Sequence, residues 1–132
     1  MITLELPLPY YKSNSKALMS VNVYRNLFHY ALSKFKKEYG SIIAQVISEH
    51  SEQEFSSLRA SYVLHTKSTK AGKPKKYDLV NILSMVDKVF MDELVKAKWI
   101  KDDCVEFVDD VRFKANPYSE RDYIEVVLEE KQ

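Results

Sequence analysis

The alternation of hydrophobic and polar residues divides the chain into strand-like and helix-like segments. Four segments alternate with the period of two that is typical of half-buried strands, at residues 2–8, 58–64, 105–113 and 123–128. Two others place apolar residues every three or four positions, which predicts amphipathic helices over residues 23–39 and 79–97. Gly40 either ends the first helix or lies inside it, because helical spacing continues through Val46.

The order of these elements predicts the fold class. A β-α-β-α-β-β order is typical of an α/β or α+β sandwich, in which two long helices cover one small mixed sheet. With 132 residues, 45% of them hydrophobic and only 2 glycines, the chain suits a single packed domain over residues 1–132. It shows no internal repeat and no composition typical of disorder.

Composition and charge exclude several classes of protein. The formal net charge of +1 names no partner, so any polyanion site must come from local clustering. The single cysteine, Cys104, allows neither an internal disulfide nor a zinc site with several thiolates. No apolar run approaches the roughly 20 residues of a membrane helix, and no glycine-rich phosphate loop indicates a nucleotide cofactor. We therefore expect a cytoplasmic protein.

Residues 67–76, which read KSTKAGKPKK, form the one strongly basic segment. A Gly and a Pro among the lysines predict an exposed loop. Such a loop attracts a phosphate backbone, although taken alone its composition is better explained by a solvated, flexible loop. The candidate DNA-binding residues are Lys67, Lys70, Lys73, Lys75 and Lys76.

The helix that follows this loop carries a polar face opposite its apolar stripe. At 100° per residue, the polar face holds Asp78, Asn81, Met85, Lys88, Asp92 and Lys96. In the simpler interpretation, Asp78 caps the helix and Lys88 pairs with Asp92.

Four acidic residues around this helix are candidates for a metal site. Asp87 lies on the flank of the apolar stripe, and Asp102 and Asp103 follow the end of the helix. A Mg²⁺ site needs carboxylate oxygens together with water and substrate phosphate. Because about 20 helical residues span about 30 Å, Asp78 and Asp103 can share an ion only if a second subunit supplies one of them.

The stretch KPKKYDLVNILSMVDKVFMDELVKAKWIKDDCVEF resembles the RusA family of phage and prophage Holliday-junction resolvases. That family has a basic loop, an Asp-x-Asp-Asn-x-x-Lys helix start, a later Asp-x-Leu and a final Asp-Asp pair. Here Asp78 and Asn81 match the helix start, residues 92–94 match Asp-x-Leu, and Asp102 with Asp103 matches the pair. The family's second Asp falls on Val80, and its Lys falls on Ser84 or Lys88 according to the direction of counting.

The resemblance implies a homodimeric endodeoxyribonuclease that resolves four-way DNA junctions in recombination and repair. It implies a cytoplasmic location in a bacterial host, a phage or prophage gene, and Mg²⁺ as cofactor with Mn²⁺ as a substitute. Asp78, Asp102 and Asp103 would hold the metal, and Lys88 would stabilise the charge of the transition state. Further candidates are Asn81, Asp87 and Asp92.

Two alternatives stay open at this level. The missing acid at position 80 and Ser84 favour a protein of the same fold that binds branched DNA without cutting it. A structural or interaction protein, with its acids as caps and surface pairs, is the third interpretation.

Overall fold

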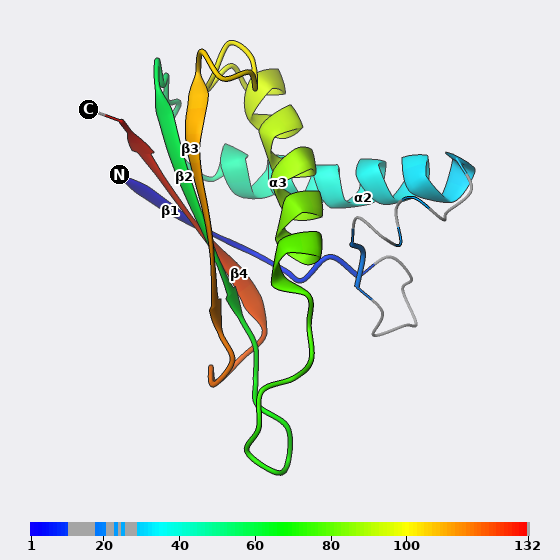
Figure 1. Ribbon diagram of the computed structural model, residues 1–132. Helices are drawn as coiled ribbons and strands as arrows, with labels where there is room; N and C mark the ends of the chain where they lie inside the picture. Colours follow the sequence, from blue (N-terminus) through cyan, green and yellow to red (C-terminus); the bar gives the residue numbers. More distant parts are fainter. Residues whose placement is uncertain (11–17, 21–22, 24, 26–28, 132) are drawn as a thin grey trace.

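A computed structural model describes residues 1–10, 18–20, 23, 25 and 29–131 of the chain (Figure 1). The start of the first predicted helix lies partly outside these residues. The elements follow the predicted order: β1 (Ile2–Leu6), α2 (His29–Ser48), β2 (Leu58–His65), α3 (Leu79–Lys96), β3 (Val108–Asn116) and β4 (Tyr123–Glu130).

The four strands form one mixed sheet in the order β1-β4-β2-β3. β4 pairs antiparallel with both β1 and β2, whereas β3 pairs parallel with β2. A parallel pair requires a crossover, and α3 supplies it. The predicted α+β class with two helices on one mixed sheet is therefore confirmed.

The observed strands differ from the prediction at the C-terminal ends of β1, β2, β3 and β4 and at the start of β3. Two of these differences have local causes. β1 ends at Leu6, two residues early, because Pro7 has no N–H to donate to the sheet. β3 begins at Val108 rather than at residue 105. A turn precedes it, in which the N–H groups of Phe107 and Val108 both donate to the Cys104 carbonyl, at 3.0 and 2.9 Å.

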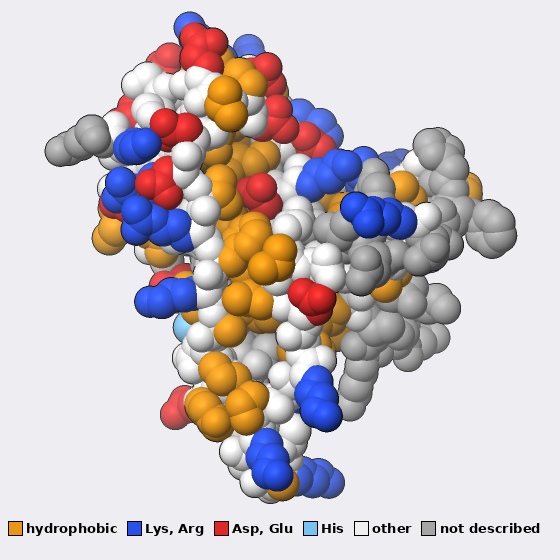
Figure 2. All heavy atoms as spheres, viewed as in Figure 1, with side chains coloured by type: hydrophobic (Ala, Val, Ile, Leu, Met, Phe, Trp, Pro, Cys, Tyr) orange, Lys and Arg blue, Asp and Glu red, His pale blue; other side chains and the backbone are white. Residues whose placement is uncertain are grey.

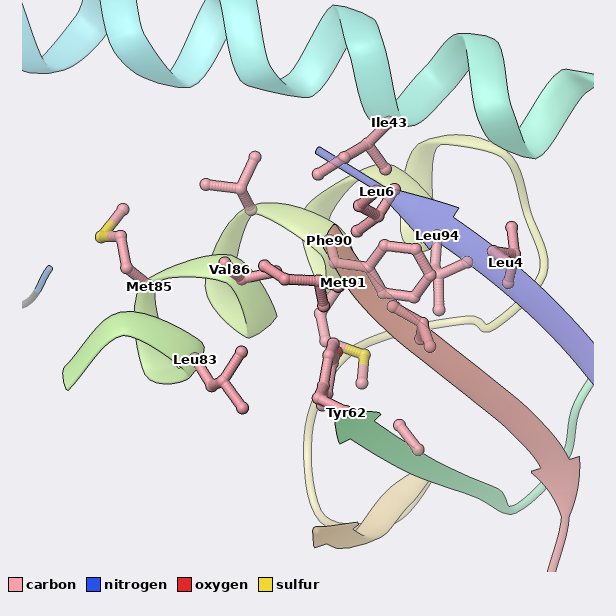
Figure 3. Close-up of a cluster of buried hydrophobic side chains, with 14 of the residues drawn as sticks. Leu4, Leu6, Ile43, Tyr62, Leu83, Met85, Val86, Phe90, Met91 and Leu94 are labelled. Carbon is pink, nitrogen blue, oxygen red and sulfur yellow. The ribbon is translucent and has the colours of Figure 1, made fainter. Parts of the chain in front are cut away.

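Both helices lie on the same side of the sheet (Figure 1). The core between these layers is built from inward residues of β1, β2 and β4 and from the apolar faces of the helices (Figure 3). Tyr62 of β2 is fully buried and meets Phe90 of α3 edge-on, with ring centroids 6.1 Å apart. This packing fixes α3 over β2 and β3.

α2 continues through Gly40 to Ser48, which settles the boundary that the sequence left open. A Cβ atom at Gly40 would lie 3.4 Å from Cδ of Glu93 on α3. The absence of a side chain at Gly40 thus gives the buried Glu93 carboxylate room against α2. Glu93 also pairs with Lys96 at 3.3 Å.

The position of Met85 on the predicted polar face of α3 was wrong, because this side chain is 1% exposed. The prediction placed the buried residues of this helix on a single apolar stripe. Since α3 packs against both the sheet and α2, its buried surface is wider than one stripe.

The other face of the sheet carries ion pairs between neighbouring strands. Arg59 pairs with Asp110 at 2.9 Å and with Glu129 at 3.5 Å, and His65 contacts Glu125 at 2.8 Å. Arg59 is therefore paired with an acid of each neighbouring strand. In the described part of the chain, none of the helices is long and apolar enough to cross a membrane.

Candidate functional site

The basic loop, residues 67–76, projects beyond the end of the sheet, between β2 and α3 (Figure 1). Asp122 holds its base, accepting a 2.8 Å hydrogen bond from the Lys67 N–H and pairing with the Lys75 ammonium at 3.7 Å. At its tip the Thr69 N–H donates to the Lys73 carbonyl at 2.7 Å, and Gly72 adopts a φ of 76° that favours glycine.

This anchoring separates Lys75 from the other four lysines of the loop. Lys75 is partly buried by its contact with Asp122. The side chains of Lys67, Lys70, Lys73 and Lys76 are exposed and form no ion pair with any residue that the structure describes. These four are therefore the cations most accessible to an anionic ligand.

Asp78 is the N-cap of α3, as the simpler interpretation predicted. Its Oδ1 accepts from the Asn81 N–H at 3.2 Å, and its Oδ2 accepts from Asn81 Nδ2 at 2.6 Å. Both Asp78 and Asn81 are thus held at the start of the helix, beside the basic loop.

Asp87 occupies a different position, between α3 and the sheet. The hydroxyl of Tyr62 donates a 2.6 Å hydrogen bond to Asp87 Oδ1. Burial raises the pKa of Asp87 above the ordinary carboxyl value, the hydrogen bond from Tyr62 lowers it, and the negative charge of Asp103 raises it.

The structure thus brings Asp87 and Asp103 close enough for their charges to interact. Asp103 lies in the exposed turn after α3, where its N–H donates to Asp102 Oδ1 at 2.8 Å. Asp78 is separate from this pair, because nine residues of helix place it about 13 Å from Asp87 along the axis of α3. Lys88 and Asp92 are exposed on α3.

Asp87 and Asp103 offer carboxylate oxygens, which suit a hard cation better than a soft one. Two carboxylates with adjacent like charge gain from a divalent cation, and Mg²⁺ commonly takes one or two carboxylates together with water and phosphate oxygens. Among the residues that the structure describes, no three His, Cys, Asp or Glu side chains gather into a metal site.

The sequence did not indicate a role for Tyr62 at this site. Its place in a strand of inward-facing residues predicted a core residue only. The available signal was its hydroxyl, since a buried tyrosine needs a hydrogen-bond partner and Asp87 was the acid at the border of the apolar stripe.

Hydrophobic side chains line the surface where α3 lies beside β3 (Figure 2), which we call the α3–β3 seam. Three exposed valines belong to these elements and to the turn between them: Val80, Val111 and Val105, at 59, 40 and 83% exposure. Exposed apolar groups of this kind are typical of interaction surfaces.

Comparisons with protein-family models and with curated proteins find no match to this chain.

Proposed function

We propose that the protein is a Mg²⁺-dependent, structure-selective endodeoxyribonuclease that resolves four-way DNA junctions in recombination and repair. The observation that carries the proposal is Asp87, a partly buried acid of α3 that Tyr62 holds by a 2.6 Å hydrogen bond. Burial and the charge of Asp103 both raise the pKa of this carboxyl group. The RusA-like order of basic loop, capped helix and final acidic pair supports the same activity.

Asp87 and Asp103 would hold the metal, and Asp102 would support Asp103, whose N–H donates to Asp102 Oδ1. When bound, Mg²⁺ activates a water molecule and neutralises charge on the scissile phosphate. Tyr62 orients the Asp87 carboxylate through its hydrogen bond. Lys88, the residue after Asp87, stabilises negative charge that develops on the phosphate.

The basic loop supplies the DNA contacts in this proposal. Lys70, Lys73 and Lys76 bind phosphates without reading sequence, because lysines on a loop neutralise the backbone wherever it passes. The anchoring of the loop by Asp122 presents these cations in a fixed direction.

A homodimer completes the proposal. Four-way junctions have a two-fold axis, and two subunits related by such an axis would each cut one strand. The α3–β3 seam, with its exposed valines, is the contact surface that we favour. In such a dimer, Asp78 of one subunit would join Asp103 of the other.

The test is cleavage of a synthetic four-way junction in Mg²⁺, with binding measured separately in EDTA. We expect wild-type protein to cut opposed strands, and Asp87→Asn and Asp103→Asn to bind the junction without cutting it. Glu49→Gln, which changes an exposed acid just after α2 that belongs to no candidate site, is the control and should cut normally.

A non-catalytic branched-DNA-binding protein is the second candidate. The observation that favours it is Val80, which is 59% exposed where the RusA-like motif has an acid. Tight junction binding without cleavage in Mg²⁺ or Mn²⁺ would establish this function and contradict the first. A monomer in light scattering at micromolar concentration would contradict the dimer.

A further inference from the structure

α2 carries a shallow groove on its exposed side that the proposed cleavage site does not use. The groove has a volume of about 680 Å³ and is lined by Tyr30, Ser33, Lys34, Lys37, Glu38 and Ser41. We call it the α2 groove. These residues recur at three- and four-residue steps, so they share one face of the helix.

Tyr30 is the most unusual of these residues, because its side chain is 80% exposed. A tyrosine ring open to solvent offers a flat aromatic surface on which a nucleobase can stack. Lys34 and Lys37 follow it by four and seven residues, so the ring and both cations lie within about 10 Å along the helix.

The cations of the α2 groove are available to an anion. Lys37 forms no ion pair with any described residue. Lys34 and Glu38 lie 4.0 Å apart with side chains 63 and 65% exposed. Because an ion pair this exposed stabilises the fold little, Lys34 can exchange Glu38 for an anionic ligand. From residue 30 to 48, α2 carries three lysines against one glutamate.

Basic side chains gather at two places on the face of the molecule drawn in Figure 2. They lie at the end of the basic loop and in the region of α2. This distribution of charge suits a polyanion that contacts both regions.

We propose that the α2 groove binds an unpaired DNA strand, with one base stacked on Tyr30 and adjacent phosphates on Lys34 and Lys37. The hydroxyl of Ser33 lies on the same face and can donate a hydrogen bond to a phosphate oxygen, whereas the Ser41 hydroxyl donates to the Lys37 carbonyl at 2.8 Å. This inference rests on DNA binding in the proposed function, but not on cleavage. It gives the protein a preference for branched DNA with single-stranded arms over fully paired DNA.

The experiment measures binding of labelled oligo(dT) and of a blunt duplex by fluorescence anisotropy in EDTA. Tyr30→Leu should weaken oligo(dT) binding about tenfold, because it removes the aromatic face and keeps apolar bulk. Tyr30→Phe should bind as wild type, since the ring is retained. The Lys34→Ala/Lys37→Ala variant should lose oligo(dT) affinity and flatten its salt dependence, with duplex binding unchanged within twofold.

Lys114→Ala on the uncovered face of the sheet is the matched control and should bind oligo(dT) normally. Thermal unfolding of each variant excludes a folding defect. Unchanged oligo(dT) binding in Tyr30→Leu, or no oligo(dT) binding by wild type, would overturn the inference. Displacement of oligo(dT) by poly-glutamate from wild type and Tyr30→Leu alike would also overturn it, in favour of an acidic peptide.

The two proposals fail separately. If wild-type protein binds oligo(dT) through Tyr30 but does not cut junctions, the proposed nuclease activity is refuted and the proposed DNA binding in the α2 groove is supported. A protein that cuts junctions with Tyr30→Leu indistinguishable from wild type in oligo(dT) binding refutes only the α2 groove.

Discussion

The hydroxyl of Tyr62 on β2 donates a 2.6 Å hydrogen bond to Asp87 Oδ1 on α3. This contact joins the buried centre of the sheet to a partly buried acid on the helix that carries the candidate site. It therefore couples the stability of the fold to the ionisation of Asp87.

Asp87→Asn should make the protein more stable at neutral pH while abolishing junction cleavage. Burial and the charge of Asp103 raise the pKa of Asp87, so the folded state binds its proton more tightly than the unfolded state does. The contribution of Asp87 to stability therefore falls as pH rises from the ordinary carboxyl pKa through the raised one, and the penalty is complete at neutral pH.

Urea unfolding between acid and neutral pH measures this effect. The free energy of unfolding of Asp87→Asn should exceed that of wild type by a margin that grows with pH. A margin that is constant across the pH range would show that Asp87 titrates normally in the folded state.

Tyr62→Phe should lower the free energy of unfolding by about 1–3 kcal/mol, because a partly buried carboxylate loses its donor. The pKa of Asp87 should rise further, since the Tyr62 hydrogen bond lowers it. We expect cleavage to fall about 10- to 100-fold near neutral pH, with the acidic limb of its pH profile moved to higher pH.

Tyr39→Phe is the control for this variant. Tyr39 is also buried, and its hydroxyl donates to the Pro7 carbonyl at 2.7 Å rather than to a carboxylate. Tyr39→Phe should lower the free energy of unfolding by a similar amount and leave the pH profile of cleavage unchanged. The same shift of the profile in both variants would refute a specific role for Tyr62.

Asp78→Asn should separate capping from metal binding. Asparagine caps a helix as well as aspartate does, so stability should change by less than about 0.5 kcal/mol, whereas Asp78→Ala should cost about 1 kcal/mol. If Asp78 enters the partner subunit's metal site, Asp78→Asn should bind the junction and fail to cut it. Normal cleavage by Asp78→Asn would leave Asp78 with its capping role alone.

Replacement of Lys70, Lys73 and Lys76 with Ala should weaken junction binding and lower its dependence on salt. Each lost phosphate contact should reduce the slope of log affinity against log salt by about 0.9. Titrations at several salt concentrations measure both quantities. Lys75 is left unchanged because it anchors the loop to Asp122, and an unaltered slope would exclude the basic loop as a DNA contact.

The sequence by itself determined the order and type of the elements, the cap at Asp78 and the exposure of the basic loop. Each of these depends on neighbouring residues: alternation defines a strand, three- and four-residue spacing defines a helix face, and a capping side chain bonds three residues ahead. The continuation of α2 through Gly40 was open at that level, because a glycine can end a helix or permit a close contact.

Only the tertiary structure decided which acids meet. In the helical projection at 100° per residue, Asp87 lay on a different face of the helix from Asp78. The spacing of residues along the chain did not connect Asp87 to Tyr62 or to Asp103. The packing of α3 on the sheet places Asp87 beside Tyr62, which lies 25 residues earlier in the chain. Asp103 follows Asp87 by 16 residues, and the turn after α3 places it where its charge acts on the Asp87 carboxylate. The burial of Met85 was also decided by the tertiary structure. The periodicity of one helix does not show that both the sheet and α2 pack against it.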